Sequence, residues 1–146
     1  MPRSQLYDED FYAWANEQAA LLRAGDLSRA DVEHIAQEIE SMGRTEKREL
    51  ASRLKVLIAH LLKWRFQAEK RTKSWEVSIR VQRRELVDHI DDNPSLKPLI
   101  DSVLAKAYPD AALVAALETG LSETVFPQHC PWTFAQMIDE DFWPEG

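Results

Sequence analysis

Residues 45–67, TEKRELASRLKVLIAHLLKWRFQ, contain the pattern that decides the fold. An apolar seam recurs here at spacings of four, three, four and three residues: Leu50, Leu54, Leu57, Leu61 and Trp64. This is the period of one face of an α-helix. Four more apolar residues widen the seam: Val56, Ile58, Leu62 and Phe66. A helix that is apolar on so much of its surface is contacted on several sides. We therefore predict a long central helix over about 45–67.

The next segment is expected to pack against this helix. Residues 74–92 place Trp75, Ile79, Leu86 and Ile90 on one helical face, with Val87 widening the stripe. Thr72 or Ser74 offers a side-chain oxygen that can cap the first turn. The two segments together predict a helical hairpin at the centre of the protein.

Two helices are expected before residue 45. The first begins at Asp8 or Asp10 and ends at Gly25, and the second begins at Ser28. The second carries a stripe that we expect to face the core: Val32, Ile35, Ile39 and Met42. Gly43 follows this stripe and is expected to end the helix.

Beyond residue 92, Asn93-Pro94 breaks the helical pattern. A fifth helix is expected over 96–107 and is stopped by Pro109, and a short sixth over 110–118 is closed by Gly120. The remaining residues include Pro127, Pro131 and Pro144, and they leave room for a short helix only over 132–140. No stretch alternates as a strand does. We predict an all-α protein, a compact bundle of about five to seven helices.

Length and composition agree with an ordinary globular protein. The 146 residues are 45% hydrophobic and 29% charged, which excludes disordered and collagen-like classes. That length favours one domain over 1–146, with the Pro-punctuated segment 121–146 packing back on the bundle. The single cysteine, Cys130, excludes an internal disulfide and favours a reducing cytoplasm. No apolar run approaches the ~20 residues of a membrane span, so we expect no contact with a membrane.

The charge is distributed unevenly along the chain. The total is −7, but residues 1–43 carry −6, residues 44–85 carry +8 and residues 86–146 carry −9. The overall charge argues against binding of nucleic acid by the whole surface. It does not exclude binding by the basic middle segment.

Five short stretches resemble a known family. They are residues 7–14 (YDEDFYAW), 39–43 (IESMG), 60–64 (HLLKW), 74–75 (SW) and 141–144 (DFWP). In order and spacing they resemble the bacterial family known as domain of unknown function 29, and the resemblance extends from about residue 6 to residue 144. It implies an α-helical bacterial protein. It implies no activity, so no catalytic residue is carried over.

The basic segment is the first candidate for a binding site. Its cations lie beside Trp64, Phe66 and Trp75: Lys63, Arg65, Lys70, Arg71, Lys73, Arg80, Arg83 and Arg84. Cations interleaved with aromatic side chains can neutralise phosphates and stack on bases. The alternative, which we favour, is that the tryptophans are core residues and the cations pair with the acidic flanks.

Histidines and glutamates form the second candidate. His34 and Glu38 are four residues apart on one expected helix, and Glu85 and His89 are four apart on another. Residues at that spacing share a helix face, so the two pairs could converge on a metal ion. The Glu-x-x-His motif of di-iron bundles is absent. Histidines with ion-pair partners at the border of the core explain the same pattern, and we expect neither a metal nor another cofactor.

His60 lies within the most apolar helix, which makes it the best catalytic candidate if the protein is an enzyme. A core histidine with a hydrogen-bond partner is the simpler interpretation. Cys130 lies in a proline-rich loop, and no nucleophile elbow, phosphate-binding loop or His-Glu-x-x-His motif occurs. We favour a non-enzymatic cytoplasmic interaction or regulatory domain whose basic hairpin contacts an acidic protein or a nucleic acid. The alternative is a small enzyme, such as a metal-dependent nuclease, that uses His60 or the two His/Glu pairs.

Overall fold

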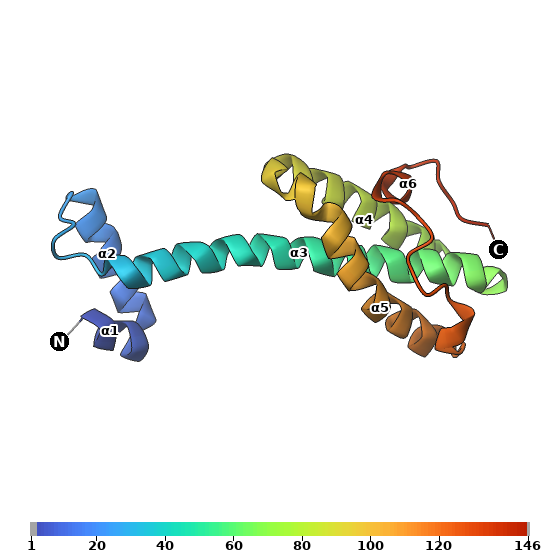
Figure 1. Cartoon of the computed structure of the whole chain (residues 1–146), viewed down its shortest axis with the longest axis horizontal. Coiled ribbons are helices and arrows are strands. Elements are labelled where there is room, and N and C mark those ends of the chain that lie inside the picture. Colours follow the sequence, from blue (N-terminus) through green and yellow to red (C-terminus); the bar gives the residue numbers. More distant parts are fainter. Residues whose placement is uncertain (1–2, 146) are drawn as a thin grey trace. The chain divides into compact units, whose positions relative to one another are not determined.

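The computed structural model describes residues 3–145, and every regular element in that range is helical (Figure 1). The α-helices are α1 (Arg3–Glu9), α2 (Phe11–Arg23), α3 (Val32–Phe66), α4 (Lys73–Asp92), α5 (Ile100–Thr119) and α6 (Phe134–Ile138). The short 3₁₀ helices are η1 (Ala68–Lys70), η2 (Pro94–Leu99) and η3 (Glu123–Val125). The all-α prediction is confirmed.

The chain divides into two compact units. Unit 1 covers Met1–Thr45 and unit 2 covers Glu46–Gly146, and α3 contributes residues to both. Each unit has its own internal packing. The single domain expected over 1–146 stays a prediction.

The prediction that a helix ends at Gly43 is wrong, because α3 continues through this residue to Phe66. Gly43 does not take a positive φ, the conformation in which glycine commonly ends a helix. A glycine inside a helix costs roughly 1 kcal/mol relative to alanine, which good helix formers on both sides can offset. Gly25 does take a positive φ of 72° just after α2, and Asp10 caps the start of that helix, as predicted.

The stripe expected to face the core before Gly43 is largely exposed. Val32, Ile39 and Met42 are 59%, 63% and 68% exposed. Ile35 is half-buried. Periodicity correctly placed these side chains on one helix face, but in the described residues little covers that face.

The core of unit 2 is built on the C-terminal part of α3. Leu50, Leu54, Leu57 and Leu61 are fully buried, as the seam predicted. They pack with residues of α4, α5 and the C-terminal segment: Ile79, Leu86, Val103, Tyr108, Ala111, Phe126, Trp132 and Met137. Each fully buried leucine contributes about 1.5–3 kcal/mol relative to an exposed one. The packing of a long helix on α4 confirms the predicted hairpin, and Thr72 caps α4 by accepting a hydrogen bond from the Trp75 N–H.

The fifth and sixth helices of the prediction are one helix. Pro109 lies inside α5 and does not stop it, and Pro94–Leu99 forms η2 instead. A proline inside a helix costs about 3 kcal/mol. Here the burial of Tyr108, Ala111 and Ala115 on both sides of Pro109 opposes that cost. Gly120, with a φ of 74°, ends α5 as expected.

Candidate functional site

Two of the eight predicted basic-site residues are buried and face the interior. Lys63 is 6% exposed and its Nζ lies 2.6 Å from Glu118 Oε2 and 5.0 Å above the Trp75 ring. Arg83 is 1% exposed. Because neither cation reaches solvent, neither can contact a macromolecular partner directly.

Arg83 holds the C-terminal segment on α4. Its Nε donates a hydrogen bond to the Met137 carbonyl at 2.6 Å, and Nη2 donates to the Phe142 carbonyl. The guanidinium also lies 5.0 Å from the centre of the Trp143 ring. Burial lowers the pKa of Arg83, and the charges of Asp139 and Glu140 oppose this effect. Among the described residues Nη1 has no hydrogen-bond partner. Arg83 is thus a clamp between α4 and residues 137–143.

The other six cations reach the surface. Arg65 is half-buried, with its guanidinium 4.8 Å from the Phe66 ring, and the rest are exposed: Lys70, Arg71, Lys73, Arg80 and Arg84. Within residues 3–145 only Lys73 has a carboxylate at ion-pair distance, Glu76 at 3.3 Å. Intramolecular pairing with the acidic flanks, which we favoured from the sequence, does not neutralise the other five in the part of the chain that the structure describes.

Six residues form one exposed strip along α4, which we call the cationic α4 face: Lys73, Val77, Arg80, Val81, Arg84 and Val87. They lie on the exposed side of α4, and Arg80 and Val87, three and four residues from the buried Arg83, border the buried stripe of Ile79, Arg83 and Leu86. The three valines on this face are 47%, 46% and 38% exposed. The face therefore combines positive charge with exposed apolar area.

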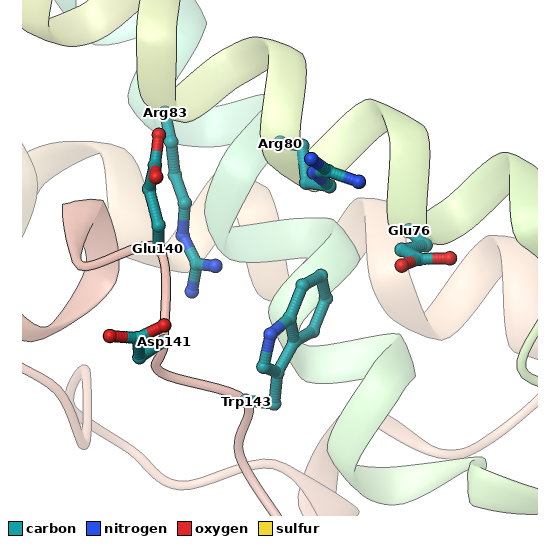
Figure 2. Close-up of a pocket in the computed structure, with 6 residues that line it drawn as sticks. All are labelled: Glu76, Arg80, Arg83, Glu140, Asp141 and Trp143. Carbon is teal, nitrogen blue, oxygen red and sulfur yellow. The ribbon is translucent and has the colours of Figure 1, made fainter.

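Two cavities lie between this face and the C-terminal segment. The larger, about 270 Å³, is lined by Glu76, Arg80, Arg83, Glu140, Asp141 and Trp143. Figure 2 shows the Arg83 guanidinium reaching toward the space between Asp141 and Trp143, while Arg80 points away from it. The second cavity, about 230 Å³, includes Arg84, Val87 and Ile138 in its lining. Both cavities border the cationic α4 face.

The aromatic rings near the hairpin are engaged within the protein. Trp64 packs on Trp143 with ring centres 4.7 Å apart, and the Arg71 guanidinium lies 4.8 Å from the Trp64 ring. Arg71 Nε also donates to the Trp64 carbonyl at 2.7 Å. Trp75 is covered by Lys63. Stacking of bases requires free ring faces, and this arrangement offers little of that.

The structure gives the predicted metal candidates other partners. In unit 1, His34 Nδ1 lies 2.8 Å from Asp31 Oδ2, and Glu38 accepts a hydrogen bond from the Tyr7 hydroxyl. In unit 2, Glu85 Oε2 pairs with Arg53 at 3.6 Å. The remaining member, His89, faces two residues that the sequence analysis did not select, Glu46 and Glu49 on α3. Their spacing of three residues on a helix predicted to pack against His89 was the available signal.

His60 has a local partner. Its Nδ1 lies 2.9 Å from the Val56 carbonyl of the preceding turn, and burial lowers the pKa of the imidazole. Cys130 is half-buried, and burial raises the pKa of its thiol, which disfavours the reactive thiolate. In the described range neither residue joins a cluster of three potential metal ligands.

The fold is that of an all-helical protein in which three cations, Lys73, Arg80 and Arg84, share one exposed face of α4. The chain belongs to the family described as Domain of unknown function DUF29, which matches residues 6–143. No curated protein and no solved structure matches the chain. In the part that the structure describes, no helix is both long and apolar enough to cross a membrane.

Proposed function

We propose that the protein is an interaction module that binds an acidic segment of a partner protein through the cationic α4 face. One observation carries the proposal: two of the three cations on this face, Arg80 and Arg84, are exposed and have no carboxylate at ion-pair distance among the described residues, while the third, Lys73, pairs with Glu76. A group of exposed cations speeds association with a negatively charged partner and favours that partner over neutral or positively charged ones. The free, half-buried Cys130 and the family resemblance support a bacterial cytoplasmic setting.

An acidic protein fits this face better than a nucleic acid does. The cations alternate with Val77, Val81 and Val87, whose exposed area suits apolar side chains of a protein helix. The tryptophans of the hairpin are already engaged within the protein: Trp75 contacts Lys63, and Trp64 contacts Arg71 and Trp143 of the C-terminal segment. The −9 charge of residues 86–146 also adds repulsion toward a long polyanion.

The experiment is a fluorescence-anisotropy titration of the full chain with two labelled probes. One is an acidic amphipathic helical peptide with glutamates on one side and leucines on the other, and the second is single-stranded DNA of similar charge. We expect the peptide to bind more tightly, and binding to weaken as salt is added. The double variant Arg80→Glu/Arg84→Glu should weaken peptide binding at least tenfold, equivalent to about 1.4 kcal/mol.

The matched control is Lys97→Glu/Lys106→Glu, which changes the net charge equally at two exposed positions outside the cationic α4 face. It should keep most of the affinity for the peptide. Equal losses in the two double variants would mean that only total charge matters and would overturn the proposed site. Tighter binding of the DNA than of the peptide would overturn the proposed protein partner and indicate a nucleic acid.

A further inference from the structure

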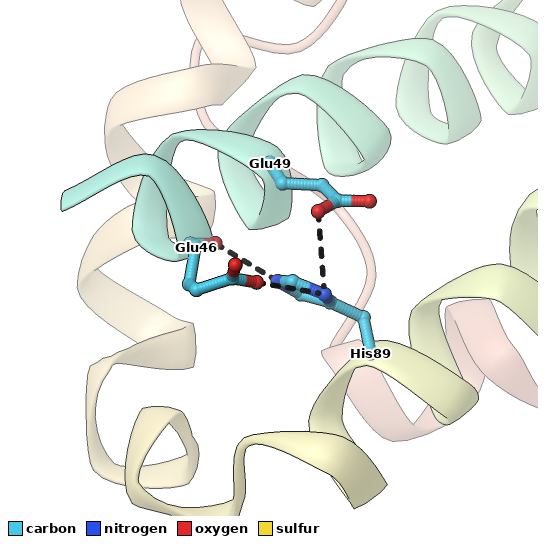
Figure 3. Close-up of side chains that lie close together, drawn as sticks. All are labelled: Glu46, Glu49 and His89. Carbon is cyan, nitrogen blue, oxygen red and sulfur yellow. Dashed lines mark hydrogen bonds and ion pairs between the residues drawn. The ribbon is translucent and has the colours of Figure 1, made fainter. Parts of the chain in front are cut away.

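His89 is held between two glutamates of the neighbouring helix. It lies on α4 and is 7% exposed, and Glu46 and Glu49 approach its ring from α3 (Figure 3). Its Nε2 lies 2.8 Å from the Glu46 backbone carbonyl. A carbonyl oxygen only accepts hydrogen bonds, so Nε2 carries a proton. Nδ1 therefore faces the two carboxylates.

The distances from Nδ1 do not match a hydrogen bond. Nδ1 lies 3.7 Å from Glu46 Oε2 and 3.6 Å from Glu49 Oε2. A charged N–H donor approaches a carboxylate to about 2.7–2.9 Å. An imidazolium would be expected to move toward one oxygen, yet here the nitrogen is nearly equidistant from both.

The same distances suit three ligands around one ion. Two donor atoms each about 2.1 Å from a tetrahedral Zn²⁺ lie roughly 3.4 Å apart. Nδ1 and the two carboxylate oxygens all lie within 4.8 Å of one another, so small side-chain movements would bring them to that spacing. One imidazole nitrogen and two carboxylate oxygens are donors that divalent first-row transition ions accept.

Neighbouring groups hold two of the three ligands in position. The Nε2–H bond to the Glu46 carbonyl fixes the orientation of the imidazole, as the second hydrogen bond of a metal-binding histidine usually does. Arg53 donates from Nε and Nη2 to Glu49 Oε1 at 3.0 and 2.9 Å. This pair leaves Oε2 directed toward His89. The cluster thus has positioned ligands in addition to acidic charge.

We propose that Glu46, Glu49 and His89 bind a divalent transition-metal ion, with Zn²⁺ as the reference, and that the ion links α3 to α4. The two glutamate side chains are 44% and 40% exposed, so an ion can enter from solvent and keep a water as its fourth ligand. The site lies wholly in unit 2 and is independent of the cationic α4 face. Its role is to stabilise the helical hairpin.

The test is calorimetric titration of chelator-treated full-length protein with Zn²⁺, together with thermal melting. We expect one equivalent to bind and the melting temperature of unit 2 to rise, because a ligand that binds only the folded state stabilises it. Co²⁺ in place of Zn²⁺ should give the visible absorption of a four-coordinate site. Glu46→Gln and Glu49→Gln, which keep the side-chain shape, should each weaken binding at least tenfold.

Glu85→Gln is the matched control, since Glu85 lies four residues before His89 on α4 but pairs with Arg53. It should retain affinity for Zn²⁺ within a factor of two to three. Absence of binding to the wild-type protein would overturn the proposal. Binding that both glutamine variants retain would place the ion elsewhere on the chain and overturn it equally.

Discussion

Unit 1 and unit 2 are both helical, but different interactions hold them together. Unit 2 has an apolar core of leucines, isoleucines and alanines drawn from α3, α4 and α5. In unit 1 the buried residues among those described are Trp14, Gln18 and Ala30. Around Trp14, unit 1 depends on directed polar contacts. The Asp31 carboxylate accepts a hydrogen bond from the Trp14 indole N–H at 3.1 Å. The backbone N–H of Asp31 donates a hydrogen bond to Gln18 Oε1 at 2.7 Å.

Aromatic stacking completes the polar cluster of unit 1. The rings of Tyr7 and His34 are stacked with centres 4.0 Å apart, and Tyr7 also meets Trp14 edge to face. Such contacts depend on geometry and ionisation, whereas apolar burial depends mainly on area. The comparison predicts that unit 2 is sensitive to lost volume and unit 1 to lost charge.

The largest expected effect comes from truncating a buried side chain of α3. Truncation of an exposed side chain of the same helix serves as the comparison. Leu57→Ala, at a fully buried position of unit 2, should lower the free energy of unfolding by about 2–5 kcal/mol. Ile39→Ala, where 63% of the residue is exposed, should change it by less than about 0.5 kcal/mol. Urea unfolding followed by far-UV circular dichroism measures both. Similar losses at the two positions would contradict the difference in packing that we describe.

Acid should destabilise unit 1 through Asp31. Burial opposes ionisation of this carboxyl, but hydrogen bonds from His34 and Trp14 outweigh burial and lower its pKa below the ordinary value of 3.8. Because the folded pKa is lower than the unfolded one, the ionised carboxylate stabilises the folded state above pH 3.8. That contribution is lost as the pH falls through the folded value.

The Trp14 indole N–H resonance reports this loss directly in a pH titration by NMR. Asp31→Asn should remove the acid-dependent step and cost about 1 kcal/mol at neutral pH, the scale of one hydrogen bond. The core of unit 2, followed by the indole of the buried Trp132, should show no matching step. An unchanged acid response in Asp31→Asn would assign the effect to another group.

The smallest expected effect is a gain in stability at Gly43, near the boundary of the two units. A Cβ built there meets no atom within 4 Å, and Gly43 lies inside α3 without a positive φ. Gly43→Ala should therefore raise the free energy of unfolding by about 0.5–1 kcal/mol. Thermal melting measures the gain. A loss in place of the gain would show that Gly43 is needed for something other than helix formation.

Apolar periodicity predicted unit 2 well because its core is large and regular. The Leu50–Leu61 seam, the Thr72 cap and the Gly120 terminus all follow from local rules. The same rules misplaced two helix ends, because glycine and proline favour termination without requiring it. Gly43 and Pro109 both remain inside helices. The exposed stripe before Gly43 was misjudged for another reason, since periodicity identifies an apolar face but not what covers it.

Which residues meet at the candidate sites depends on the register in which the helices pack. That register cannot be read from the sequence. Local spacing paired His89 with Glu85, but the packing of α4 on α3 brings it to Glu46 and Glu49. The sequence shows the cations of the basic segment only as neighbours along the chain. Only the packed structure separates the buried Lys63 and Arg83 from the exposed Arg80 and Arg84.

The Arg83 clamp has a consequence for the order of folding. Arg83 is separated by 54 residues from Met137 and by 59 residues from Phe142, the two residues whose carbonyls it binds. The Trp14–Asp31 hydrogen bond joins residues that are only 17 positions apart. Closing a longer loop costs more chain entropy, and contacts between distant residues slow folding. Unit 1 can gain its polar contacts early, from neighbours in sequence. Unit 2 reaches its final state only when residues 137–142 return to α4, so docking of this segment is expected to be the slow, last step of folding.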